Sequence, residues 1–115
     1  MSQHHYKAAY RGKRVDVQFG WDRPCRGFYL VIQNEGARDD NFVYSNLNDE
    51  SLLPYMGMPP TIDPLLAVLK RLGITIPQTM IEAVRQDGID NVGNKSVIYD
   101  AAGNAKSPGR GGPAG

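Results

Sequence analysis

Apolar and polar residues alternate near the start of the chain. Val15, Val17, Phe19 and Trp21 fall on one side of an extended backbone, and the residues between them are mostly polar. A period of two is typical of a strand that buries one of its faces. We therefore expect a strand here, preceded by a hairpin whose turn lies at residues 11–13.

Three further segments have strand character. Residues 27–33 are apolar on both faces, which is typical of a strand in the interior of a sheet. Residues 42–47 and 95–100 are shorter and carry β-branched or aromatic residues. The first three strands follow one another through short loops, and this order predicts an antiparallel meander.

Helical periodicity begins in the second half of the chain. Asp63 is a suitable N-cap, Pro64 suits the first turn, and leucines follow at spacings of three and four until Gly73. A second apolar stripe runs from Pro77 to Gly88, and glycine is common just past the end of a helix. The pattern predicts two helices that form a compact helical hairpin.

These elements predict an α+β fold with the order β-β-β-α-α-β and, if the early hairpin forms, a further strand at the front. An antiparallel meander of three to five strands would carry the helical hairpin on one face. The expected domain spans residues 1–102, because residues 103–115 are mostly Gly, Pro, Ala and Ser and are expected to be disordered. The expected core consists of Val15, Val17, Phe19, Phe28, Leu30, Ile32, Leu65, Leu69, Leu72, Met80, Ile81 and Val84.

Length and composition exclude several classes of protein. A chain of 115 residues suits one domain, and a net charge of +1 gives no general attraction to a polyanion. The single cysteine excludes an internal disulfide and a cysteine-based zinc site. No apolar run approaches the roughly 20 residues that span a bilayer, and the first residues lack the apolar core of a signal peptide. A cytoplasmic protein without membrane contact is therefore expected.

The only cysteine is one candidate for chemistry. Cys25 lies between Arg23 and Arg26, and nearby cations lower the pKa of a thiol and raise its reactivity. A nucleophile also needs a base, and the two histidines, His4 and His5, lie in a terminal segment that we expect to fray. Cys25 is therefore interpreted as an incidental loop residue.

Acidic residues offer a second candidate. Asp39 and Asp40 would suit acid–base work only if buried, and their Gly- and Asn-flanked loop is expected to be exposed. They could share a metal ion with His4 and His5, but adjacent histidines on a strand point to opposite faces. The sequence contains no phosphate-binding loop, no zinc-protease motif and no nucleophile elbow. We therefore predict no catalytic residue, no metal and no cofactor.

Charge is distributed unevenly along the chain. Residues 1–30 carry a net positive charge and residues 31–66 a net negative charge. One interpretation is complementarity between neighbouring strands and loops. The other is a basic hairpin with an acidic rim that together orient a partner.

The segment "LLPYMGMPP", residues 52–60, is apolar without strand or helical periodicity. It either covers the sheet as a lid or forms an interface, since Met and Tyr are favoured at adaptable interfaces. We predict a small non-enzymatic binding or accessory protein that acts through contacts with a protein partner. The residues expected to make these contacts are Arg11, Arg14, Arg23, Arg26, Tyr55, Met56 and Met58.

Two alternatives stay open at the level of sequence. A nucleic-acid-binding module would use the aromatic residues that lie among the cations of the first hairpin, Tyr6, Tyr10, Trp21 and Tyr29. A small enzyme of unknown reaction would need a pocket of titratable groups. The chain is also expected to be able to form homo-oligomers, because a short meander leaves an edge strand free to pair with a second copy.

Overall fold

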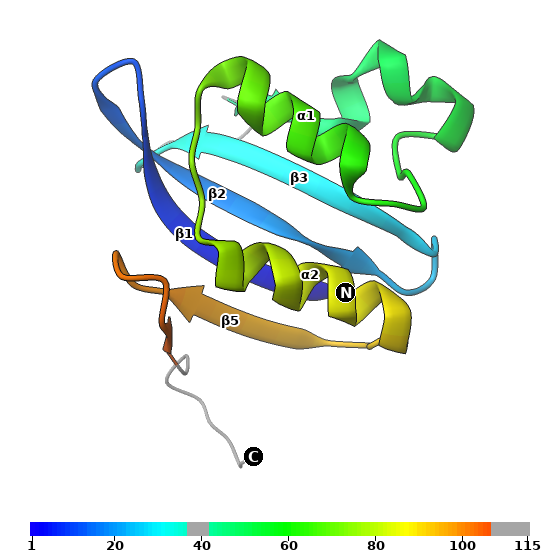
Figure 1. Cartoon of the computed structure of the whole chain (residues 1–115). Coiled ribbons are helices and arrows are strands. Elements are labelled where there is room, and N and C mark those ends of the chain that lie inside the picture. The colour runs from blue at the N-terminus through cyan, green and yellow to red at the C-terminus, as the bar shows by residue number, and fades with distance from the viewer. Residues whose placement is uncertain (37–41, 107–115) are drawn as a thin grey trace.

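The computed structural model describes residues 1–36 and 42–106. Its centre is a mixed sheet of six strands in the spatial order β4-β3-β2-β1-β5-β6 (Figure 1). Strands β1 to β4 form the antiparallel meander, and β5 pairs in parallel with β1. The strands are β1 Ser2–Tyr10, β2 Lys13–Asp22, β3 Gly27–Asn34, β4 Phe42–Ser45, β5 Lys95–Tyr99 and β6 Ala105–Lys106. The predicted α+β class is confirmed, with β1 as the additional strand at the front.

The N-terminal segment is a strand and not a frayed end. It lies between β2 and β5 and pairs with both, so Ser2 and His4 are fully buried. The expectation of a solvated terminus is therefore wrong for His4. The reason is its position on the central strand β1, on the face that the helices cover, where a polar side chain reaches buried partners.

Both helices lie on the same face of the sheet (Figure 1), as predicted. Helix α1 spans Asp63–Leu72 and ends at Gly73, whose left-handed backbone (φ 73°) confirms the expected stop. Ile62 takes the N-cap position in place of Asp63, which is the first helical residue and makes no capping hydrogen bond. Its carboxylate still lies in the first turn, where negative charge is favourable.

Helix α2 spans Gln78–Asp90 and continues through Gly88, so the predicted end at Gly88 is wrong. The left-handed residue that ends this helix is Asn91, with φ 50°. A Cβ at position 88 would overlap the ring of Phe28 on β3. Glycine therefore lets α2 lie close against the sheet, which is a packing role that the local sequence does not reveal.

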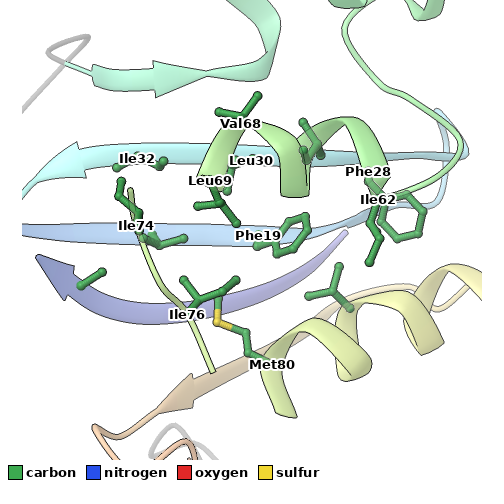
Figure 2. Packing of buried hydrophobic residues seen from close by; sticks show 14 of the residues in the cluster. Phe19, Phe28, Leu30, Ile32, Ile62, Val68, Leu69, Ile74, Ile76 and Met80 are labelled. Atoms are coloured by element: carbon green, nitrogen blue, oxygen red, sulfur yellow. The ribbon is translucent and has the colours of Figure 1, made fainter. Parts of the chain in front are cut away.

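The core fills the space between the helices and the sheet (Figure 2). All the predicted core residues are buried except Leu72 and Ile81, which are partly buried and pack against the core. The connection between the helices is an extended segment that places Ile74 and Ile76 on the sheet between them (Figure 2). The two helices therefore share a core with this connection in addition to the sheet.

The first residues after the expected domain boundary at 102 are part of the fold. Gly103 is buried, and its carbonyl accepts a hydrogen bond from the Thr79 hydroxyl at 2.5 Å. Strand β6 then pairs with the end of β5. Residues 107–115, the rest of the expected tail, lie outside the described residues. Within residues 1–36 and 42–106, no helix is long and apolar enough to cross a membrane.

Candidate protein-binding groove

The helices cover one face of the sheet, and charged side chains lie on the opposite face. The Lys7 ammonium is 2.5 Å from Asp16 and 3.3 Å from Glu35, and the Arg14 guanidinium is 3.9 Å from Glu35. All four side chains are about half exposed, so these pairs add little stability. They favour the first interpretation of the uneven charge, namely complementarity between neighbouring strands.

The segment after β4 lies along the β3 edge, where β4 has ended. It contains two 3-10 helices, Asn46–Asn48 and Glu50–Tyr55. Asn46 is buried and accepts a hydrogen bond from the Leu30 amide at 3.2 Å, while its own amide donates to the Gly57 carbonyl at 2.7 Å. Asn46 therefore joins the edge of β3 to the end of this segment.

A second hydrogen bond holds the same segment further along the β3 edge. The Phe28 amide donates to the Pro59 carbonyl at 2.8 Å. Gly27 precedes it, and a Cβ there would lie 2.6 Å from the Met58 Cβ. The absence of a side chain at Gly27 therefore allows Met58 to lie directly against the start of β3.

The 46–60 segment buries the apolar side chains of Leu52 and Pro59 and exposes several others. Leu52 is 3% exposed and belongs to the core, as a lid would require. Leu53, Tyr55 and Met56 are exposed, and Met56 reaches 86%. Leu47 is 71% exposed. The two interpretations of the segment, lid and interface, thus apply to different residues.

A groove of about 610 Å³ lies where this segment meets the open face of the sheet. We call it the Met–Tyr groove. Its floor comes from β2 and β3, and its wall comes from the 46–60 segment. The floor residues are Gln18, Tyr29 and Val31, and the wall residues are Asn46, Leu47, Tyr55, Met56 and Met58; Met1 also lines the groove.

Hydrogen bonds hold the floor of the Met–Tyr groove in place. The Tyr29 hydroxyl donates to the Ser2 carbonyl at 2.7 Å and accepts from the Gln18 amide at 3.1 Å. Burial raises the pKa of Tyr29, so the phenol stays neutral. The Tyr29 hydroxyl and the Gln18 amide nitrogen are therefore engaged within the chain, and the groove offers a largely apolar surface.

One end of the groove is formed by the β2–β3 turn. Asp22 and Cys25 line it there. A hydrogen bond to the Asp22 carboxylate raises the pKa of the Cys25 thiol, and the negative charge of Asp22 adds to the effect. The expectation that neighbouring arginines lower this pKa is therefore wrong, because the group nearest to the thiol is an anion.

Cys25 is expected to react with iodoacetamide more slowly at pH 7 than an unperturbed cysteine does, because less thiolate is present. Its rate should rise with pH around a midpoint above about 8.5, the ordinary value for a thiol. The Asp22→Asn variant should lower the midpoint and react faster at pH 7. A midpoint below 8 in the wild-type protein, measured by mass spectrometry of the alkylated chain, would contradict this assignment.

The structure brings together some of the residues predicted to contact a partner. Tyr55, Met56 and Met58 line the groove. Arg11 and Arg14 lie at the other end of β2, where the Arg11 guanidinium stacks 5.2 Å from the Tyr10 ring centre.

The arginines of the β2–β3 turn do not line the groove either. Arg23 extends toward Gly93, in the connection between α2 and β5. Arg26 adopts a left-handed backbone, with φ 50°, and its amide closes the turn by donating to the Arg23 carbonyl at 3.2 Å. The β2–β3 turn and the Met-rich 52–60 segment therefore meet at the groove. The turn contributes Asp22 and Cys25 to it, and not its two arginines.

Sequence reasoning missed a buried polar cluster on the helix-covered face. His4 Nε2 lies 2.6 Å from Asp87 of α2, and His4 Nδ1 lies 2.9 Å from the Tyr99 hydroxyl on β5. The Lys95 ammonium reaches the other Asp87 oxygen at 2.8 Å. His4 and Asp87 are 0% and 2% exposed. Lys95 is 41% exposed, so the cluster reaches the surface through its ammonium while its buried part joins β1, α2 and β5.

The hydrogens of this cluster follow from its partners. A carboxylate only accepts, so His4 Nε2 carries a proton and donates to Asp87. Burial, followed by the charge of Asp87, raises the pKa of Tyr99 to about 12, so its hydroxyl stays protonated at neutral pH. Every buried side-chain nitrogen and oxygen of the described residues has a partner.

Other candidates from the sequence receive no support from the described residues. Within residues 1–36 and 42–106, no group of three or more His, Cys, Asp or Glu side chains could hold a metal ion. Asp39 and Asp40 lie outside the described residues. Comparison of the chain with protein-family models, curated proteins and solved structures finds no match.

Proposed function

We propose that this protein is a non-enzymatic binding protein that holds a segment of a protein partner in the Met–Tyr groove. The observation that carries the proposal is the group of large apolar side chains that line the groove and stay exposed, Leu47, Tyr55 and Met56. A large exposed apolar patch on a protein surface often marks a site of interaction with a partner. Met and Tyr together suit such a site, because Met adapts to the shape of its partner and Tyr adds a rigid ring.

The chemistry of the groove favours binding over catalysis. Its volume, about 610 Å³, suits a few side chains of a partner. The pKa values of Cys25 and Tyr29 are raised, so neither group supplies a nucleophile at neutral pH. The polar atoms of Tyr29, Gln18 and Asn46 bond to groups within the chain. These features support a surface that recognises shape and apolar character.

The positions of the aromatic residues favour a protein partner over a nucleic acid. Tyr6, Tyr10 and Trp21 pack against the core on the helix-covered face, and Tyr29 is 4% exposed. A single-stranded nucleic acid needs accessible rings on which its bases stack. The rings that the sequence suggested for stacking are therefore engaged in the fold.

Peptides selected from a random phage-displayed library on the wild-type protein are expected to bind Met56→Asn at least tenfold more weakly. Met56 has a left-handed backbone (φ 55°), which Asn tolerates, so this change removes apolar surface without straining the segment. A tenfold loss corresponds to about 1.4 kcal/mol, within the range of one well-placed interface residue. Fluorescence anisotropy with labelled peptides measures the affinities.

Ile89→Asn is the matched control for this experiment. Ile89 is 70% exposed on α2, on the other side of the sheet from the groove. Selected peptides should bind this variant as they bind the wild-type protein. Peptides whose affinity is unchanged by Met56→Asn, or reduced equally by both variants, would refute the proposal.

A further inference from the structure

Among the described side chains that line the Met–Tyr groove, one is formally charged, that of Asp22. The raised pKa values of Cys25 and Tyr29 keep these two groups neutral, and the ammonium of Met1, which also lines the groove, donates to the Asn94 side chain. Asp22 is the last residue of β2 and is partly buried. Its position gives the groove a negative end at the β2–β3 turn and an apolar remainder.

Two cations near this end, Arg23 and the Met1 ammonium, have neighbours other than Asp22. None of the ion pairs within 4.0 Å among the described residues includes Asp22. Arg23 extends toward Gly93, and the N-terminal ammonium of Met1 donates to the Asn94 side chain at 3.0 Å. The described contact of the Asp22 carboxylate at this end is the Cys25 thiol. A thiol is a weak donor and occupies a fraction of the acceptor sites of a carboxylate.

An occupant that covers the groove removes water from Asp22. A buried carboxylate is strongly unfavourable unless a cation or several donors replace the lost water. An apolar segment alone would therefore bind poorly at this end, although it suits the remainder. Lys and Arg combine a long apolar stem, which can lie along the Met and Tyr side chains, with a charged head that can reach the carboxylate.

We infer that the segment held in the Met–Tyr groove is an apolar peptide with a lysine or arginine that pairs with Asp22. This inference rests on the proposed function and names the chemistry of its partner. Asp22 is then the residue that selects among apolar segments. A segment with Glu at that position would be repelled by the carboxylate, and a segment with an uncharged residue there would leave it unpaired.

The test uses peptides selected from the same random library, sequenced and measured one at a time. The expected peptides share large apolar residues and a Lys or Arg at one fixed position. Replacing that cation by Gln should weaken binding to the wild-type protein about tenfold and should leave binding to Asp22→Asn unchanged. Asp63→Asn, which removes a carboxylate at the start of α1 on the helix-covered face, is the control and should bind as the wild-type protein does.

Each alternative outcome has a distinct meaning. Peptides that lose affinity on Met56→Asn but show no preference for a cation would overturn the inference and leave the proposed function standing. Peptides indifferent to Met56→Asn would overturn both. Dimers found by analytical ultracentrifugation at micromolar concentration, and abolished by Met56→Asn, would make a second copy of the chain the occupant and would also overturn the inference.

Discussion

Replacing Asp87 by alanine is expected to lower the free energy of unfolding by about 3 kcal/mol, because the change removes a buried acceptor of two hydrogen bonds, one of them from the Lys95 ammonium. Asp87 connects α2 with two neighbouring strands, because it accepts hydrogen bonds from His4 on β1 and Lys95 on β5. Its loss leaves the proton on Nε2 of the fully buried His4 without an acceptor. Urea denaturation followed by circular dichroism measures the change.

Asp90→Ala is the matched control for Asp87→Ala. It removes a carboxylate from the same helix, but Asp90 is exposed and bonds to the exposed Gln86 side chain at 3.1 Å. Its effect should stay within about 0.5 kcal/mol, as is usual for surface substitutions. Equal effects of the two substitutions would show that the cluster contributes nothing beyond an ordinary surface charge.

The pH dependence of stability provides a second readout of the same cluster. Burial on its own would raise the pKa of Asp87, but hydrogen bonds from His4, Lys95 and Ser2 hold it below its usual value. A carboxyl whose pKa is lower in the folded state stabilises the fold above the unfolded-state value of about 3.9. That contribution disappears as the pH falls through the folded-state value. The wild-type protein should therefore lose stability in acid, and Asp87→Asn should lose less of it.

The fold was predictable where burial follows the pattern of apolar residues. Val15, Val17 and Phe19 alternate, and the structure places them on the covered face of β2. The N-terminal strand was not predicted over its full length, because Ser2 and His4 are polar residues that point into the core. A pattern of apolar and polar residues assigns such positions to the surface. His4 is buried because its hydrogen-bond partner, Asp87, lies more than eighty residues away in the sequence and is brought next to it by the fold.

The sequence predicted one wall of the candidate groove, but not which other segments lie beside it. The composition of the segment that contains Tyr55 and Met56 suggested an interface without reference to the fold. The role of Asp22 depends on the β2–β3 turn lying beside that segment, and no local spacing in the sequence encodes this. The four arginines illustrate the converse error, because charge along the sequence says little about which side chains face a common surface.

Gly20 tests whether the N-terminal strand lies where the structure places it. Gly20 is in the interior of β2, where glycine usually marks a close approach of backbones. A Cβ at this position would overlap the Ser2 carbonyl oxygen and lie 2.9 Å from a carbon of the Tyr29 ring. The same Ser2 carbonyl accepts the Tyr29 hydroxyl, and the Ser2 hydroxyl accepts the Trp21 amide at 3.0 Å.

Gly20→Ala is therefore expected to lower the free energy of unfolding by about 3 kcal/mol, at the upper end of the range for overpacked sites, because backbone and not a flexible side chain must move. Gly93→Ala is the control: a Cβ there would meet only the Arg23 side chain, at an ordinary 3.6 Å, and should change stability by less than about 0.5 kcal/mol. Equal stability of the two variants would place the N-terminal residues away from β2.

The double variant Gly20→Ala with Asp87→Ala separates local strain from loss of the N-terminal strand. Both substitutions disturb the position of the first residues, one through the Ser2 carbonyl and the other through the bonds of Asp87 to His4 and Ser2. Once one substitution has displaced this segment, the other has less to disrupt. The double variant should therefore lose at least about 1 kcal/mol less unfolding free energy than the sum of the two single variants. If urea denaturation shows fully additive effects, the contact of β1 with Gly20 and its contact with Asp87 stabilise the fold independently. That result would contradict a role for Ser2 in both contacts.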